Sequence, residues 1–110
     1  MSVPTFIHLH NHTDYSMFDS TIRVNSLIEK TQEFGMPAVA ITDSNNMCGA
    51  IEFYLKCKRA DIKPIIGAEI SVKSVLPVQE DHRERPIYKL VLLCVNLTGY
   101  RNLCRIVNRL

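Results

Sequence analysis

The chain has 110 residues, of which 46% are apolar and 22% are charged, and its net charge at neutral pH is only +2. This composition is close to that of an average folded domain, so it excludes a disordered tail, a collagen-like repeat and a disulfide-dense miniprotein. The length allows one domain with one core, but a closed (β/α) barrel needs about 200 residues or more.

Hydrophobic periodicity and breaker residues predict an alternation of strands and helices. In chain order, we expect a strand over 5–12, a loop over 13–22, a helix over 23–34, a strand over 38–42, a turn over 43–46, a helix over 48–60, a strand over 63–72, a surface excursion over 73–86, a strand over 88–95 and a helix that Thr98 caps. Strand–helix–strand units favour a parallel sheet. The expected fold class is therefore α/β, with about four mostly parallel strands and about three helices.

The expected helices carry recognisable apolar faces and end signals. The first helix is expected to stop at Gly35. In the helix over 48–60, the inward side chains are expected to be Ile51, Tyr54 and Leu55. The apolar residues that share a face of the last helix are Leu103, Ile106, Val107 and Leu110.

Histidines cluster near the start of the chain, where His8, His10 and His12 lie two residues apart. Residues two apart in a strand point to the same side, so we expect three imidazoles on one face. Adjacent imidazoles repel one another when protonated, whereas neutral imidazole is a good ligand for Zn²⁺, Mn²⁺ or Fe²⁺. The cluster therefore predicts a divalent-metal site, and the alternative is a polar strand face with hydrogen-bonded histidines.

Carboxylates are expected near these histidines: Asp19 follows the first strand, Asp43 ends the second, and Glu69 lies within the third. Sites in parallel sheets lie at the carboxyl ends of the strands. A charged side chain within a strand is costly unless it is paired or bound to metal, which makes Glu69 a candidate ligand. The alternative roles are a turn or cap for Asp43 and an exposed strand rim for Glu69. Histidines and carboxylates together are typical of a hydrolytic divalent-metal centre.

The cysteines and the start of the chain indicate the compartment. The first residues match no targeting signal, and no run of the sequence approaches the length of a membrane span. The four cysteines form no Cys-x-x-Cys pair. We therefore expect reduced thiols, a cytoplasmic protein and no membrane partner.

Three segments resemble the motifs of a known family, the PHP (polymerase and histidinol phosphatase) superfamily. They are residues 6–19 (FIHLHNHTDYSMFD), 35–49 (GMPAVAITDSNNMCG) and 63–70 (KPIIGAEI). Within that superfamily, residues 92–103 (LLCVNLTGYRNL) are similar to the PHP domains at the N-terminus of bacterial DNA polymerase III alpha subunits. The resemblance spans nearly the whole chain.

The resemblance implies a distorted (β/α)7 barrel with a trinuclear metal site, of which residues 1–110 form the N-terminal portion. His8 stands where the family often has an aspartate, and Asp43 matches the aspartate of a Thr-Asp-His motif. Ser44 stands where that motif has a ligand histidine, so this ligand position is degraded, because a neutral hydroxyl binds zinc weakly. The positions that match metal ligands of the family are His10, His12, Asp19 and Glu69.

The resemblance also implies a function. A PHP domain of this kind lies at the N-terminus of the catalytic subunit of a replicative DNA-directed DNA polymerase. There it serves as a scaffold and as a metal-dependent 3′–5′ exonuclease or phosphoesterase site. The implied cofactors are Zn²⁺ or Mn²⁺ in the PHP site and Mg²⁺ in the full polymerase. The implied partners are the rest of the alpha subunit, DNA and the proofreading exonuclease subunit.

The polymerase's own catalytic residues are not expected in this chain. The alternatives are a stand-alone PHP phosphoesterase of the histidinol-phosphatase kind and a metal-free binding module.

Overall fold

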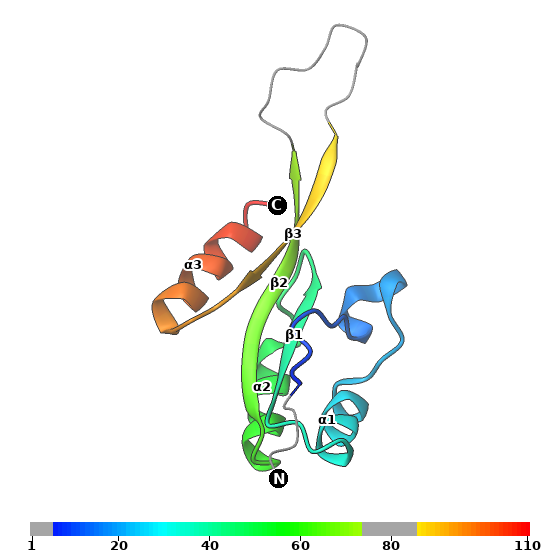
Figure 1. The fold of residues 1–110 in the computed structure, drawn as a ribbon. Helices are drawn as coiled ribbons and strands as arrows, with labels where there is room; N and C mark the ends of the chain where they lie inside the picture. The colour runs from blue at the N-terminus through cyan, green and yellow to red at the C-terminus, as the bar shows by residue number, and fades with distance from the viewer. Residues whose placement is uncertain (1–5, 74–85) are drawn as a thin grey trace, which may run out of the picture.

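The computed structural model describes residues 6–73 and 86–110, apart from the side chains of residues 18 and 19. Within these ranges the chain forms a mixed α/β fold, with three α-helices, a short 3-10 helix and a three-stranded sheet (Figure 1). The elements are η1 (Asp14–Asp19), α1 (Val24–Glu33), β1 (Ala38–Ser44), α2 (Ala50–Arg59), β2 (Lys63–Lys73), β3 (Ile87–Leu93) and α3 (Leu97–Val107). The predicted α/β class is confirmed, and most of the excursion expected over 73–86 lies outside the described residues.

The sheet has the strand order β1-β2-β3 and contains both pairing directions. β1 and β2 are parallel, with Ala38 opposite Lys63 and Ser44 opposite Glu69. β2 and β3 are antiparallel, with Glu69 opposite Val91. The expectation of mostly parallel strands is therefore wrong for β3. The sequence between β2 and β3 has prolines and mixed charges rather than a helical apolar pattern, and an antiparallel pair needs no crossover helix.

Residues 6–12 do not form the strand that their alternating pattern predicts, although they run beside β1. The Ala40 N–H donates a hydrogen bond to the His8 carbonyl at 3.2 Å. The Thr42 N–H donates in the same way to the Asn11 carbonyl at 2.9 Å. The Asn11 side-chain amide donates to the carbonyl oxygens of both His8 and Ala40. Side-chain hydrogen bonds thus take the place of the regular backbone ladder that defines a strand.

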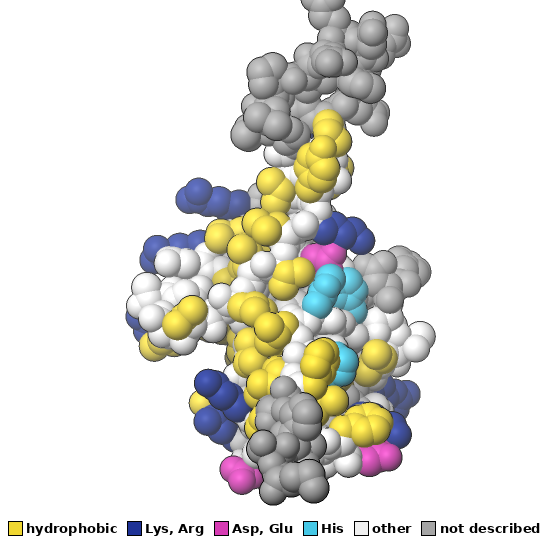
Figure 2. Space-filling view, in the orientation of Figure 1, with side chains coloured by type: hydrophobic (Ala, Val, Ile, Leu, Met, Phe, Trp, Pro, Cys, Tyr) yellow, Lys and Arg dark blue, Asp and Glu magenta, His cyan; other side chains and the backbone are white. Residues whose placement is uncertain are grey.

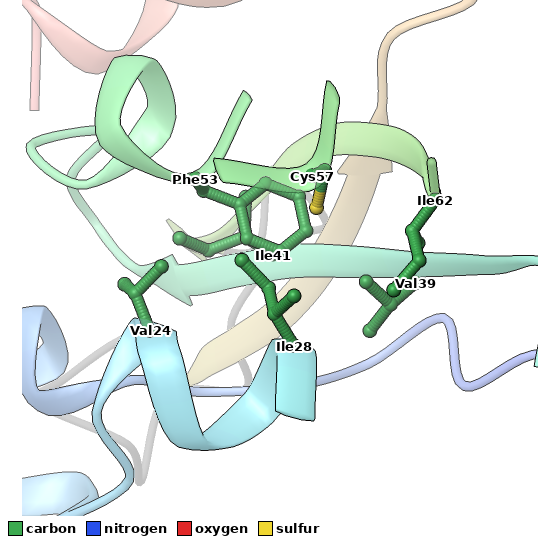
Figure 3. Close-up of a cluster of buried hydrophobic side chains, with 7 residues drawn as sticks. All are labelled: Val24, Ile28, Val39, Ile41, Phe53, Cys57 and Ile62. Atoms are coloured by element: carbon green, nitrogen blue, oxygen red, sulfur yellow. The ribbon is translucent and has the colours of Figure 1, made fainter. Parts of the chain in front are cut away.

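The main core lies between α1, β1 and α2 (Figure 3). Its buried residues are Val24, Ile28, Val39, Ile41, Phe53, Cys57 and Ile62. A second cluster, under α3, joins Ala68 and Ile70 of β2 to Leu103. Successive strand residues point to opposite faces, so Glu69, between Ala68 and Ile70, belongs to the face of the sheet away from this cluster.

The buried face of α2 differs from the one expected. Phe53 and Cys57 are fully buried, whereas the residues predicted to face inward, Ile51, Tyr54 and Leu55, are 67%, 45% and 50% exposed. Both faces of this helix carry apolar side chains, so periodicity could not choose between them, and the Phe53 ring offers a large area to bury. Burial also raises the pKa of the Cys57 thiol to about 11, so the thiol stays protonated at neutral pH.

The last helix, α3, begins earlier than expected. Asn96, rather than Thr98, is the N-cap residue, because its side-chain oxygen accepts a hydrogen bond from the Gly99 N–H at 2.9 Å. The apolar residues expected to share one face do not all face inward. Leu103 is buried, whereas the exposed members of the set are Ile106 and Leu110.

Several apolar side chains remain exposed in the described part of the chain, and Figure 2 shows them gathered in a band along one face. A pocket of about 550 Å³ lies between α2 and the start of α3, and its apolar lining includes Ile51, Tyr54, Val95, Leu97 and Tyr100. Exposed apolar area of this kind is typical of a surface that another element covers. None of the described helices is long and apolar enough to cross a membrane.

Candidate metal centre

The segment that carries the histidines is held against the end of β1 by Asn11 and Thr42. The Asn11 N–H donates to Thr42 Oγ1 at 2.9 Å, and the Thr42 hydroxyl donates to the Asn11 carbonyl at 3.1 Å. Because Asn11 lies between His10 and His12, these hydrogen bonds fix the backbone on which both imidazoles stand.

The imidazoles of His10 and His12 converge on one carboxylate oxygen of Glu69. Each Nε2 atom lies 2.5 Å from Glu69 Oε2, and the two rings meet edge to face with their centroids 5.3 Å apart. The ligand atoms of the three residues all lie within 4.8 Å of one another. The Glu69 side chain is 5% exposed, that of His12 is 19% exposed and that of His10 is 56% exposed. The carboxylate is therefore the most buried member of the group, and His10 is the most exposed. Figure 2 shows histidine side chains at the surface beside an acidic side chain.

The surroundings of Glu69 favour its charged form. Burial by itself raises the pKa of this carboxyl, but the hydrogen bonds and charges of His10 and His12 outweigh the effect of burial. The pKa of Glu69 is therefore lowered from its ordinary value. Metal ligands must be deprotonated, and in the absence of metal the carboxylate of Glu69 is already held in its charged form.

Asp43 directly precedes Ser44 at the end of β1 but does not join this group. Its carboxylate is 1% exposed and accepts hydrogen bonds from the Thr13 N–H, the Thr13 hydroxyl and the Ser16 hydroxyl. Neighbouring residues of a strand point to opposite faces, so Asp43 lies on the face opposite to that of Ser44. Asp43 therefore anchors the start of η1 to β1.

Ser44 is the register partner of Glu69, so the two side chains belong to the same face of the sheet. The position at which the PHP pattern has a ligand histidine thus lies next to the His10–His12–Glu69 group. A serine hydroxyl at this position is a weaker metal ligand than imidazole.

The structure does not bring His8 to the group. Its ring packs edge-on against Phe6, with centroids 4.7 Å apart, and it lines a groove along α1 with Leu27 and Lys30. The face expected to be shared by three histidines requires a regular strand, which residues 6–12 do not form. Asp19 ends η1, and its side chain lies outside the described part of the structure.

Sequence reasoning missed Lys89 of β3, whose Nζ lies 3.8 Å from Glu69 Oε1. The available signal was a single lysine within the apolar run of β3. At the same end of the sheet, Asn45 Nδ2 donates to Ser71 Oγ at 3.1 Å and the Ser71 N–H donates to Asn45 Oδ1 at 2.9 Å. These contacts add a basic residue and a polar rim to the site.

The donor set of the group fits a divalent metal ion. Two imidazoles and one carboxylate form the His₂Glu set of catalytic zinc sites, which keep a further position for water or substrate. Mixed nitrogen and oxygen ligands also accept Mn²⁺ or Fe²⁺. His10, His12 and Glu69 are therefore candidate ligands of one ion.

Comparisons with known sequences agree with these features. The profile described as PHP domain matches residues 8–109. DNA polymerase III subunit alpha of Chlamydia pneumoniae is 44% identical over 102 residues, which cover 91% of this chain and 8% of that protein. The same subunit of Escherichia coli strain K12 is 41% identical over 109 residues, which cover 99% of this chain and 9% of that protein. The chain thus spans less than a tenth of the length of these curated relatives.

A solved structure has a similar fold. It is the crystal structure of a protein from Bifidobacterium adolescentis that is assigned as a metal-dependent phosphoesterase, and it aligns with a TM-score of 0.58 at 25% sequence identity. The alignment covers 82% of this chain and 27% of that protein. This likeness agrees with the partial (β/α) barrel predicted from the sequence.

Proposed function

The chain belongs to the PHP domain family, and from this we propose that His10, His12 and Glu69 bind a divalent metal ion for phosphoester hydrolysis. The observation that carries the proposal is the convergence of two imidazole Nε2 atoms on one buried carboxylate oxygen. The likeness to a protein assigned as a metal-dependent phosphoesterase supports the reaction class. For a chain that belongs to a DNA polymerase subunit, we propose that this hydrolysis takes the form of a 3′–5′ exonuclease.

We also propose that the chain forms the N-terminal part of a PHP domain in a bacterial DNA polymerase III alpha subunit. Its identity of 40–44% to such subunits, of which it spans only 8–9%, supports this place in a larger protein. The exposed apolar side chains of α2 and β3 support the packing of further barrel elements here. The proposed partners are the rest of the alpha subunit, DNA and the proofreading exonuclease subunit, in the cytoplasm.

The chemistry follows from the positions of the three side chains. A bound Zn²⁺ or Mn²⁺ ion supplies a Lewis acid and an acidified water molecule. His10 and His12 would hold such an ion with their imidazole nitrogens, and Glu69 would contribute negative charge. The buried Glu69 and half-buried His12 exclude water from one side, whereas the exposed His10 leaves the other side open to a phosphate ester.

A metal-free structural module is the second candidate function, and the serine at position 44 favours it. Ser44 faces the same side as Glu69 where the family pattern has a histidine, so this chain lacks one ligand of that pattern. In a metal-free module, the hydrogen bonds of His10 and His12 to Glu69 join the N-terminal segment to β2. The site then contributes to the stability of a scaffold.

Calorimetric titration of the metal-free protein with Zn²⁺ or Mn²⁺ distinguishes the two candidates. We expect the wild type to bind the ion and His12→Ala to weaken binding by more than about 100-fold, because losing even an outer partner of a metal site costs up to about that factor. His8→Ala is the matched control, since it removes an imidazole of the same segment that lies away from Glu69. Lack of metal uptake by the wild type would support the metal-free module, and equal losses in both variants would show that the ligands are misassigned.

The same proteins test the reaction class. The metal-loaded wild type and His8→Ala should release p-nitrophenolate from bis(p-nitrophenyl) phosphate, and His12→Ala should not. Metal binding without any hydrolysis would support the proposed metal site and contradict the proposed activity.

Ser44→His tests whether one ligand is missing. The new imidazole would stand opposite Glu69 on the same face of the sheet, so we expect metal affinity to rise by roughly tenfold, or about 1.4 kcal/mol. Ser26→His adds an imidazole on α1 and serves as the control. An unchanged affinity in Ser44→His would mean that this end of β1 lies too far from the bound ion.

A further inference from the structure

Lys89 is the basic side chain that approaches the candidate metal centre from β3. It stands opposite Ser71, which lies two residues beyond Glu69 on β2, so Lys89 and Glu69 belong to the same face of the sheet. Its Nζ lies 3.8 Å from Glu69 Oε1. The sheet therefore places a positive charge beside the carboxylate on which the two histidines converge.

The two oxygens of Glu69 have different neighbours. Oε2 accepts from the Nε2 atoms of His10 and His12, whereas Oε1 faces the Lys89 ammonium. The Glu69 side chain is 5% exposed, so water screens this charge poorly, while Lys89 is 70% exposed. The ammonium is thus a counter-ion that can leave for solvent without losing a buried contact.

We propose that Lys89 is a built-in counter-cation of Glu69, which competes with a divalent metal ion for this carboxylate and so sets the metal affinity of the site. The inference rests on the proposed function, because the competing ion is the one that His10, His12 and Glu69 bind. Without metal, the ammonium balances the charge of Glu69. On metal binding, a divalent cation and the ammonium share one carboxylate, and their repulsion moves Lys89 toward solvent.

The size of the competition follows from the exposure of Lys89. A 3.8 Å separation is longer than a direct hydrogen bond, and contacts of exposed charges are weak. Removing the charge should therefore tighten metal binding by about two- to fivefold at low salt, and the gain should shrink as ionic strength rises. Such a salt dependence would not result from a packing change alone.

The test is calorimetric titration of the protein with Mn²⁺ at low and high salt. We expect Lys89→Met to bind Mn²⁺ about two- to fivefold more tightly than the wild type, and Lys89→Arg, which keeps the charge, to resemble the wild type. Lys63→Met is the matched control, because it makes the same charge change on β2 at a distance from the site. Lys63 belongs to the same face of the sheet as Glu69 but lies six positions earlier, and so roughly 20 Å away.

Each outcome separates this inference from the proposed function. Equal Mn²⁺ affinities of the wild type and Lys89→Met would overturn the inference and leave the metal site in place. Binding of Mn²⁺ by Lys89→Met but not by the wild type would support the inference and contradict the proposed function of the native site. An equal gain in Lys63→Met would overturn the inference by showing a general charge effect, and no binding by any variant would overturn both proposals.

Discussion

Replacing Phe53 with alanine is expected to lower the free energy of unfolding by about 3–5 kcal/mol. The Phe53 ring is fully buried in the main core between α1, β1 and α2 (Figure 3). The substitution removes apolar area and leaves a cavity that the surrounding elements can close only in part. Small domains have total stabilities of about 5–15 kcal/mol, so this is a large fraction of the whole. Urea denaturation followed by circular dichroism measures the change.

Leu55→Ala is the matched control on the same helix. Leu55 is 50% exposed, so its truncation should cost less than about 1 kcal/mol. A larger loss for Leu55→Ala than for Phe53→Ala would contradict the structure and favour the helix face expected from periodicity.

Asp43→Ala is expected to lower the free energy of unfolding by about 2–4 kcal/mol. The carboxylate accepts hydrogen bonds from two Thr13 donors and from the Ser16 hydroxyl, and all three residues are buried. A buried donor that loses its acceptor costs about 1–3 kcal/mol, and water that enters the space of the lost carboxylate reduces the sum. The loss should appear in urea denaturation and as faster proteolysis near η1.

Asp14→Ala provides the comparison, because Asp14 is an exposed acidic residue of the same 3-10 helix. It should change stability by less than about 0.5 kcal/mol. If Asp43→Ala kept its stability but lost metal binding, Asp43 would be a ligand and not the anchor of η1.

Periodicity and breaker residues located the central elements well. α1, β1 and β2 start and end within two residues of the expected positions, and α1 ends before Gly35, whose φ is +67°. These elements have clear signals, because their apolar patterns are bounded by glycine, proline or polar turns. The face of α2 was not predictable, since apolar side chains surround that helix and only the neighbouring elements decide which of them are buried.

The sequence predicted which residue types form the candidate site, whereas the structure showed on which face of the sheet each of them lies. The strand alternation that predicted His10 and His12 on one side also included His8, because it assumed a regular strand that the hydrogen bonds of Asn11 interrupt. The alternation did not separate Asp43 from the site, because the register of β1 against β2 is a tertiary property. Lys89 was missed for the same reason, since its distance from Glu69 depends on the antiparallel pairing of β3.

The sequence distances within the fold have a consequence for the order of folding. Ala38 pairs with Lys63, 25 positions later, whereas His10 meets Glu69 across 59 positions. Closing the longer loop costs more chain entropy, so the β1-α2-β2 unit is favoured to assemble first and the contact of His10 with Glu69 to form afterwards. We therefore expect the contact between the two histidines and Glu69 to be absent from the folding transition state. A bound metal ion should therefore slow unfolding while leaving the rate of folding nearly unchanged.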